Sequence, residues 1–163
     1  RDYKGLDLLI NSVKYLNNRI SDLKVLVVGE NYESMSKYYD LIDRANLKDK
    51  FLFDLQFVKE HNTAKYFISS DIVVLPYKTA SQSGIISLAY NFNRPVIVTD
   101  VGGLKEYVVE NKTGFIVNPD EKDLSNKINY FFENKLFEEM SLFIKNYKEK
   151  FSWKSFEEKI NEK

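Results

Sequence analysis

Hydrophobic and polar positions follow two alternating patterns along the chain. Short apolar runs rich in β-branched residues predict strands, and apolar residues three or four positions apart predict the helices between them. The run that ends at Gly29 is typical of a buried parallel strand. Strands that alternate with helices predict an α/β fold, with a Rossmann-like open parallel sheet covered by helices on both faces. The expected strands lie near 24–29, 50–55, 72–75, 95–98 and 114–117.

Helical spacing of the apolar residues also predicts where the helices lie. Ser34, Asn62 and Asp120 stand at three of their expected starts, where side-chain oxygens can accept hydrogen bonds from helix amides. The sequence contains no internal repeat and no linker, so a single domain is expected over residues 1–163. The predicted helices span 6–16, 34–45, 62–69, 84–92, 104–108, 120–132, 136–147 and 155–160.

The composition narrows the classes of protein that fit. The 163 residues are 44% apolar, with 12 Phe and 11 Tyr, which is enough for one domain with a sizeable core. Basic and acidic residues number 24 each, so no basic excess points to nucleic acid. The absence of cysteine excludes disulfides and thiolate sites, and the one histidine, His61, excludes a multi-histidine metal site. No apolar run approaches the roughly 20 residues of a membrane-spanning helix.

The stretch from residue 72 to residue 104 organises the candidate chemistry. A buried strand ends at Pro76, a polar turn follows, and Gly84 begins a helical pattern. Such a unit places the loop at the carboxyl edge of a parallel sheet, where open α/β sheets bind ligands. Helix N-terminal amides favour phosphate, so we interpret Ser81–Gly84 as an anion or sugar site. The alternative is an ordinary helix cap made by Ser81 or Ser83.

Three further features are candidates for binding, each with a plainer alternative. Arg1 and Lys4 stand three residues apart before a helix, and this pair suits a diphosphate, although two solvated surface charges have the same pattern. Gly103, with Gly102, either permits a close backbone approach or forms an ordinary turn. Tyr77 follows a strand end, where its ring either lines a cleft or closes the core.

Several stretches, taken together and in order, resemble one known family. The chain is similar to the carboxyl-terminal, donor-binding domain of the retaining glycosyltransferases of family 4, or glycosyl transferases group 1, which have the two-domain GT-B architecture. Each piece is weak, but the ordered set is specific and covers nearly the whole chain. The matching pieces are Arg1-Asp-Tyr-Lys-Gly-Leu-Asp-Leu-Leu9, Val25-Leu-Val-Val-Gly29, Ser70-Asp-Ile-Val-Val-Leu-Pro-Tyr77, Ser81-Gln-Ser-Gly84, Arg94-Pro-Val-Ile97, Val101-Gly-Gly-Leu-Lys-Glu106, Thr113-Gly-Phe-Ile-Val117 and Phe151-Ser-Trp153.

The resemblance implies roles at matching positions. Arg1 and Lys4 match the basic pair that grips the donor diphosphate, which makes them the expected catalytic residues. Phe57 and Val58 match the stretch whose backbone meets the nucleotide base. The other expected donor-binding residues are Tyr77, Gln82, Ser83, Gly84, Ser87 and Gly103.

The helix that begins at Gly84 departs from the family pattern. The residues Gln82–Gly84 match the loop and helix start that face the distal phosphate and the donor sugar. The family often has two glutamates across this helix, one near the donor sugar and one near the ribose. Here those positions hold Ala80 and Leu88, and neither is acidic. A subset of the family with a Gln-Ser-Gly turn lacks the first glutamate in a similar way, and Ser87 is the candidate substitute for the second.

The resemblance implies that the chain binds a nucleoside diphosphate sugar. The enzyme would transfer the sugar, with retention of configuration, to a glycan or lipid-linked acceptor, with no metal and no other cofactor. The family also suggests a cytoplasmic enzyme of bacterial surface polysaccharide synthesis, and leaves a peripheral association with the inner face of the membrane open.

The domain organisation follows from the same resemblance. No signal peptide is visible, but the chain opens directly on Arg1, which suggests a fragment. We expect it to lack the N-terminal acceptor domain and the first strand of its own domain. The isolated domain is then expected to be inactive in transfer. The donor sugar, the base and the acceptor are not readable from this chain.

Two other functions stay open. A related GT-B enzyme, such as an epimerase or a phosphorylase, needs extra acidic, basic or cofactor-binding residues that are not found in the sequence. A non-catalytic domain that kept the fold and lost donor binding is consistent with the missing acids at Ala80 and Leu88.

Overall fold

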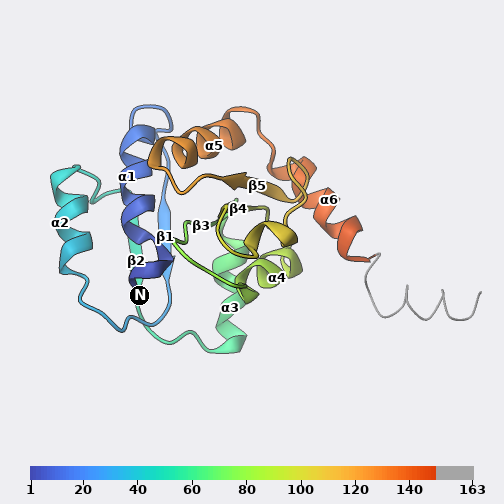
Figure 1. Ribbon diagram of the computed structural model, residues 1–163, viewed down its shortest axis with the longest axis horizontal. Coiled ribbons are helices and arrows are strands. Elements are labelled where there is room, and N and C mark those ends of the chain that lie inside the picture. The colour runs from blue at the N-terminus through green and yellow to red at the C-terminus, as the bar shows by residue number, and fades with distance from the viewer. Residues whose placement is uncertain (150–163) are drawn as a thin grey trace, which may run out of the picture.

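The computed structural model describes residues 1–149, in which strands lie between layers of helices (Figure 1). All five predicted strands are present, and their ends lie within one residue of those expected. The strands are β1 (Val25–Val28), β2 (Phe51–Asp54), β3 (Val73–Leu75), β4 (Val96–Thr99) and β5 (Gly114–Val117).

The helices connect these strands in the predicted order. None of the helices in the described part of the chain has the length and apolar character needed to cross a membrane. The helix predicted at 155–160 lies outside the described residues. The helical segments are the single 3₁₀ turns η1 (Asp2–Lys4) and η2 (Leu104–Tyr107), and the α-helices α1 (Leu6–Leu16), α2 (Ser36–Arg44), α3 (Glu60–Ile68), α4 (Gly84–Asn91), α5 (Glu121–Glu133) and α6 (Phe137–Glu149).

Of the three helix caps predicted from the sequence, one is formed as expected. Asp120 caps α5 as expected, because its carboxylate accepts hydrogen bonds from two amides of the first turn. The cap predicted at Asn62 is wrong, since α3 begins at Glu60 after an extended Lys59 and has no side-chain cap. Ser34 precedes the start of α2 by two residues, and its hydroxyl accepts a hydrogen bond from a single amide, at 3.3 Å.

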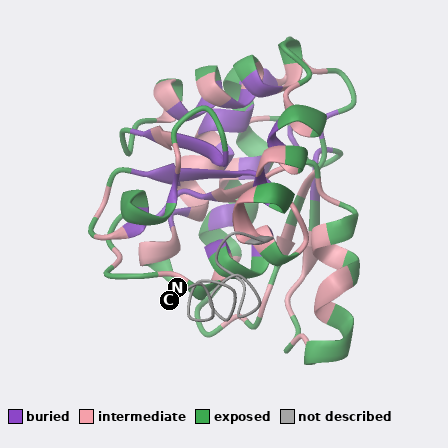
Figure 2. Cartoon of the chain, turned by 90° about the vertical axis from the view of Figure 1, so that its right-hand side faces the viewer, coloured by how far each residue is buried: buried purple, intermediate pink, exposed green. Residues whose placement is uncertain are grey.

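The two faces of β4 show how the core is divided. Ile97 is fully buried in a cluster that includes Ile10 of α1 and residues of α2 and α5. Val96 and Val98 point to the other face and pack in a second cluster with Ile86 of α4. Figure 2 shows the buried residues concentrated on the strands and on the helix sides that face them. The part of the sheet around β4 is therefore covered on both faces, as predicted, whereas Leu26, Val28 and Leu52 leave one face of the β1–β2 pair exposed. Every strand pair is parallel, as predicted.

A gap separates β1 from β3. Within residues 1–149 the strands form two ladders, β1 with β2 and β3 with β4 and β5, and no strand joins them. A cavity of about 720 Å³ lies in the gap, lined by residues 26–28 of β1 and 73–75 of β3. The open sheet expected from the sequence is therefore interrupted at its centre, because the described residues supply no strand there.

Alternation along the strands identifies the backbone groups that face the gap. The amides of Val25 and Gly29 donate hydrogen bonds toward β2. Successive residues of a strand point their backbone groups to opposite sides, so the amides of Leu26 and Val28 point into the gap. The same argument places the amide of Val74 on the gap side of β3, since its neighbour in the strand bonds toward β4.

We predict that the amide hydrogens of Leu26 and Val28 exchange with solvent at least about tenfold faster than those of Val25 and Gly29. The ladder bonds protect the second pair, whereas the first pair has no ladder partner in residues 1–149. Native-state hydrogen exchange followed by NMR measures all four, and the two protected residues control for opening of the strand as a whole. Equal protection of the two pairs would contradict an open edge on β1.

Candidate functional site

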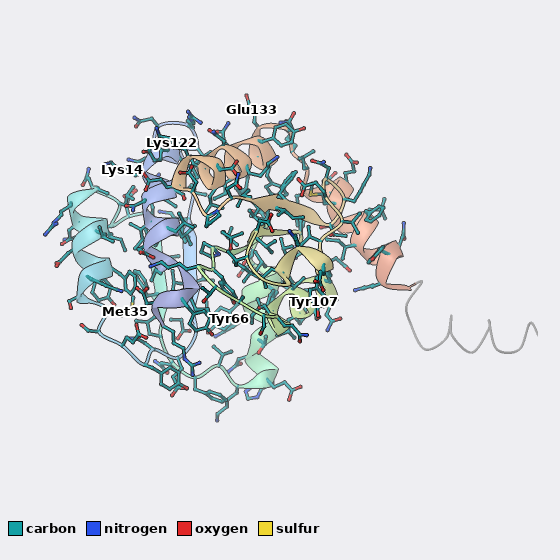
Figure 3. The ribbon with its side chains drawn as sticks, in the orientation of Figure 1. Lys14, Met35, Tyr66, Tyr107, Lys122 and Glu133 are labelled. Atoms are coloured by element: carbon teal, nitrogen blue, oxygen red, sulfur yellow. The ribbon has the colours of Figure 1, made fainter. Side chains whose placement is uncertain are left out.

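The site lies where η1 and the loop after β3 meet at the carboxyl edge of the strands. Arg1 is the N-cap residue of η1 and Lys4 is its last residue, and Tyr77 follows the end of β3. All three residues line the cavity in the gap. Met35 and Tyr66, labelled in Figure 3, contribute to its wall from the α2 and α3 sides. The chain therefore brings both expected catalytic residues to the edge where open parallel sheets bind ligands.

Lys4, Tyr77 and Ser83 form a short series of polar contacts. The Lys4 ammonium donates a hydrogen bond to the Tyr77 hydroxyl at 2.7 Å and lies 4.1 Å from the centre of the Tyr77 ring. The same hydroxyl lies 3.4 Å from Ser83 Oγ. Tyr77 is only 4% exposed, so its ring closes the core while its hydroxyl reaches Lys4 at the cavity wall. Both interpretations of Tyr77 from the sequence thus hold, for different parts of the side chain.

The first turn of α4 is open at its amino end. Ser83 occupies the N-cap position with an extended backbone, but its side chain makes no capping hydrogen bond. The ordinary side-chain cap considered for Ser83 is therefore not formed. The amides that begin at Gly84 carry partial positive charge and lack partners within the helix. They are available to an anion beside the Lys4 ammonium.

Two glycines hold the loop between β3 and α4 by close backbone contact. Gly102 has a φ of 52°, and a Cβ added there would lie 1.5 Å from the carbonyl oxygen of Ala80. A Cβ on Gly103 would lie 2.6 Å from the carbonyl oxygen of Ser81. The close approach considered for Gly103 is thus confirmed, and any larger residue in this turn would push the loop away.

The loop after β1 adds residues that sequence reasoning missed. The Arg1 guanidinium carbon lies 5.2 Å from the centre of the Tyr32 ring, and the Tyr32 hydroxyl bonds to the Glu30 carboxylate. Both loop residues line the cavity beside Arg1. The available signal was their position just past Gly29, at the same carboxyl edge as the other candidates.

The remaining candidates lie at different places around this edge. Val58 lines the cavity, whereas its neighbour Phe57 is 72% exposed and does not line it. Leu88 lines the cavity, so an apolar side chain stands where the resemblance placed a glutamate. Gln82 and Ser87 are exposed and lie outside the cavity lining.

An ion-pair network joins η1 to its surroundings. The Lys78 ammonium lies 3.0 Å from Asp2 Oδ2 and 2.7 Å from Asp7 Oδ2, and Lys37 of α2 binds the other oxygen of Asp2. Hydrogen bonds from Lys37 and Lys78 lower the pKa of Asp2 to about 2, so this carboxylate is charged at neutral pH. The hydrogen bond to Asp7 in turn raises the pKa of Lys78. The segment that carries both basic candidates is thereby tied to α1, α2 and the loop after β3.

Comparison with known proteins identifies the family. A profile of the family described as "Glycosyl transferases group 1" matches residues 1–151. The chain belongs to this family. An uncharacterized glycosyltransferase of Methanocaldococcus jannaschii is 31% identical over 122 residues, which are 74% of this chain and 30% of that protein. The D-inositol 3-phosphate glycosyltransferase of Arthrobacter sp. (strain FB24) is 30% identical over 119 residues, which are 71% of this chain and 28% of that protein.

This group 1 chain also has the fold of solved glycosyltransferases. The crystal structure of Anabaena HepE in complex with UDP matches with a TM-score of 0.81 at 20% identity, covering 99% of this chain and 45% of that one. At this identity the likeness establishes the fold alone. It confirms the α/β fold class predicted from the sequence, as found in GT-B glycosyltransferases. The chain spans less than a third of the length of the two curated relatives.

We predict that Gly102→Ala lowers the free energy of unfolding by about 2 kcal/mol or more, because the new Cβ meets a carbonyl oxygen at a positive φ. Gly84→Ala is the matched control, since a Cβ there meets no atom within 4 Å. Its effect should stay below about 1 kcal/mol. Urea unfolding of both variants measures the difference, and equal stabilities would contradict the close contact with Ala80.

Proposed function

We propose that the chain is the C-terminal, donor-binding domain of a retaining GT-B glycosyltransferase of family 4, and that it binds a nucleoside diphosphate sugar. One observation carries the proposal: Lys4 and Ser83 approach each other through Tyr77, with contacts of 2.7 and 3.4 Å. An ammonium group thereby lies beside the open amides of a helix N-terminus. This combination suits a pyrophosphate, because charge-assisted hydrogen bonds and oriented amides can act on the same oxygens.

The same groups account for the chemistry of transfer. Breaking the anomeric C–O bond of a nucleoside diphosphate sugar builds negative charge on the leaving diphosphate. In our proposal Arg1, Lys4 and the amides near Ser83 and Gly84 stabilise that charge as it develops. These protein groups take the role that a metal ion has in other transferases, so the proposal includes donor binding without magnesium. Retention of configuration is part of the proposal through the family.

A structural relative suggests which nucleotide to test for binding first. Anabaena HepE has been solved with UDP and with UDP-glucose. Uridine diphosphate is therefore the first probe for this chain, and guanosine diphosphate is the second. In the proposal the base lies near Val58, which lines the cavity, and near the exposed Phe57 beside it.

The proposal extends to the whole enzyme. In our proposal the glycan or lipid-linked acceptor binds an N-terminal domain across a cleft. A further parallel strand fills the gap between β1 and β3. The backbone of Leu26 and Val28, which has no ladder partner within residues 1–149, supports such a strand. We place the enzyme in the cytoplasm or at the inner face of the membrane, in bacterial surface polysaccharide synthesis.

A second candidate function is a non-catalytic domain that has lost donor binding. The observation that favours it is the absence of an acid at Ala80 and at Leu88, of which the second lines the cavity. Nucleotide binding separates the two candidate functions, because only a donor-binding domain binds a nucleoside diphosphate through Arg1 and Lys4.

Isothermal titration with UDP and GDP, in the absence of magnesium, provides that test. We predict that the chain binds at least one of them, and that Arg1→Ala and Lys4→Ala each weaken binding by about ten- to a hundredfold, as expected for lost hydrogen bonds to a charged ligand. Lys14→Ala, at an exposed position of α1, is the matched control and should leave the affinity unchanged. Absence of binding by the unmodified chain and by Arg1→Ala alike would favour the non-catalytic domain.

We also predict that the chain by itself transfers no sugar from UDP-glucose to glycan acceptors, because the proposed acceptor site lies on another domain. Release of UDP and formation of glycosylated product measure this. Nucleotide binding by the same preparation shows that the chain is folded and competent for its donor. Transfer by the isolated 163 residues would refute the proposed division of the two sites.

A further inference from the structure

η1 carries the candidate catalytic residues but buries none of its own residues fully, although the Tyr3 ring packs edge-on against Tyr77. It is a single 3₁₀ turn, Asp2–Lys4, with no buried residue. Arg1 stands at its N-cap, and Lys4 ends it. Burial therefore does not fix the direction of the two basic side chains, and other contacts must do so.

Lys78 supplies three of those contacts from the loop after β3. Its backbone amide donates a hydrogen bond to the carbonyl oxygen of Tyr3 at 2.8 Å. Its ammonium group reaches Asp2 at 3.0 Å and Asp7 at 2.7 Å. The loop that continues to Ser83 is thus joined to the η1 turn by both main chain and side chain.

A backbone contact reinforces the join. A Cβ on Gly5, just after η1, would lie 1.8 Å from the carbonyl oxygen of Pro76, so the two segments touch at the level of the main chain. The second oxygen of Asp7 is buried and has no hydrogen-bond partner among the described residues. Lys78 is therefore the group that compensates the charge of Asp7, and removing it would leave a half-buried carboxylate unpaired.

The charge of Asp2 by itself opposes binding of an anion. Asp2 lies between Arg1 and Lys4 in the sequence, where a carboxylate repels a diphosphate held by its neighbours. The Asp2 and Lys78 side chains are 51% and 37% exposed, so their ion pair contributes little to the stability of the fold. Its main effect is on geometry, because it adds to the contacts that hold a turn in which no residue is fully buried.

We propose that Asp2 and Lys78 are positioning residues for the diphosphate site. Their ion pair sets the distance between the basic side chains of η1 and the amide end of α4, so that both act on one diphosphate. This inference rests on the proposed function and adds to it the groups that pre-organise the site. Neither residue needs to touch the nucleotide.

Asp2→Asn gives a test in which two explanations predict opposite changes in nucleotide affinity. If only the charge of Asp2 matters, removing it strengthens binding of UDP or GDP. If Asp2 positions the site, Asp2→Asn weakens binding by about tenfold, because the charge-assisted contacts of Asp2 with Lys37 and with Lys78 are both lost. Asp43→Asn is the matched control, because it breaks an exposed ion pair, at 3.1 Å, between Asp43 of α2 and Lys48 beyond the end of that helix. Titration calorimetry of both variants gives the comparison.

Lys78 variants show whether the pair acts as a unit. We expect Lys78→Met to weaken binding by about tenfold, and the double variant Asp2→Asn/Lys78→Met to bind no more weakly than the worse single variant. Lys78→Arg keeps a cation that pairs with both carboxylates and should stay within about threefold of the unmodified chain. The unfolding midpoint of Asp2→Asn should fall by no more than about 4 °C, which separates loss of position from loss of fold.

The outcomes separate this inference from the proposed function. If the unmodified chain binds UDP or GDP and Asp2→Asn binds it equally or more tightly, the positioning role is overturned and the proposed function stands. If the unmodified chain binds neither nucleotide, the proposed function fails, and the inference falls with it. Should Lys78→Met not fold, Asp2→Asn and Lys78→Arg still decide the matter.

Discussion

The hydrogen bond between Lys4 and Tyr77 joins the first turn of the chain to the end of β3, and the candidate site is arranged around it. The lysine comes from a surface turn, whereas the tyrosine is buried and its carbonyl oxygen accepts a 2.6 Å hydrogen bond from Thr99 of β4. The cation of a partly buried lysine is thereby held by a buried partner in the core. A charge held in place before the ligand arrives needs little reorganisation when negative charge develops beside it.

The loop after β3 is the second half of this arrangement. It is held from one side by Gly102, whose backbone touches Ala80, and from the other by Gly5, whose backbone touches Pro76. Ser83 can therefore stand at the start of α4 without capping it, because the loop does not depend on that cap for its conformation. The open amides that result are connected to Lys4 through two side-chain contacts, Lys4 with Tyr77 and Tyr77 with Ser83. The chain belongs to the glycosyl transferases group 1 family, and in the proposed function these amides bind the donor diphosphate.

Local patterns predicted most of the fold, since strands and helices are set by apolar spacing within a few residues. The helix expected at 6–16 has those bounds in the structure. The cap at Asn62 was wrong because a capping residue is only one influence on where a helix begins, and the extended backbone of Lys59 starts α3 earlier. The gap between β1 and β3 could not be foreseen from periodicity, because strand pairing is decided by tertiary contacts.

The site was predicted in its outline but not in its details. Arg1, Lys4 and Tyr77 could be named because sequence position and a family resemblance both point to the carboxyl edge of the sheet. The role of Lys78 was not readable, because its partner Asp2 lies 76 positions away and such a pairing exists only in the folded chain. Tyr32 was missed although its position just past Gly29 places it at the same edge, because its ring contact with Arg1 exists only in the folded chain.

The most direct test of the central claim is an NMR titration of the isotope-labelled chain with UDP, or with GDP if UDP does not bind. If one diphosphate is held by both halves of the site, the amide signals of Lys4 and Tyr77 shift together with those of Ser83 and Gly84, and all four report one dissociation constant. Shifts at Lys4 that leave Ser83 and Gly84 unmoved, or different dissociation constants for the two pairs, would contradict a shared site.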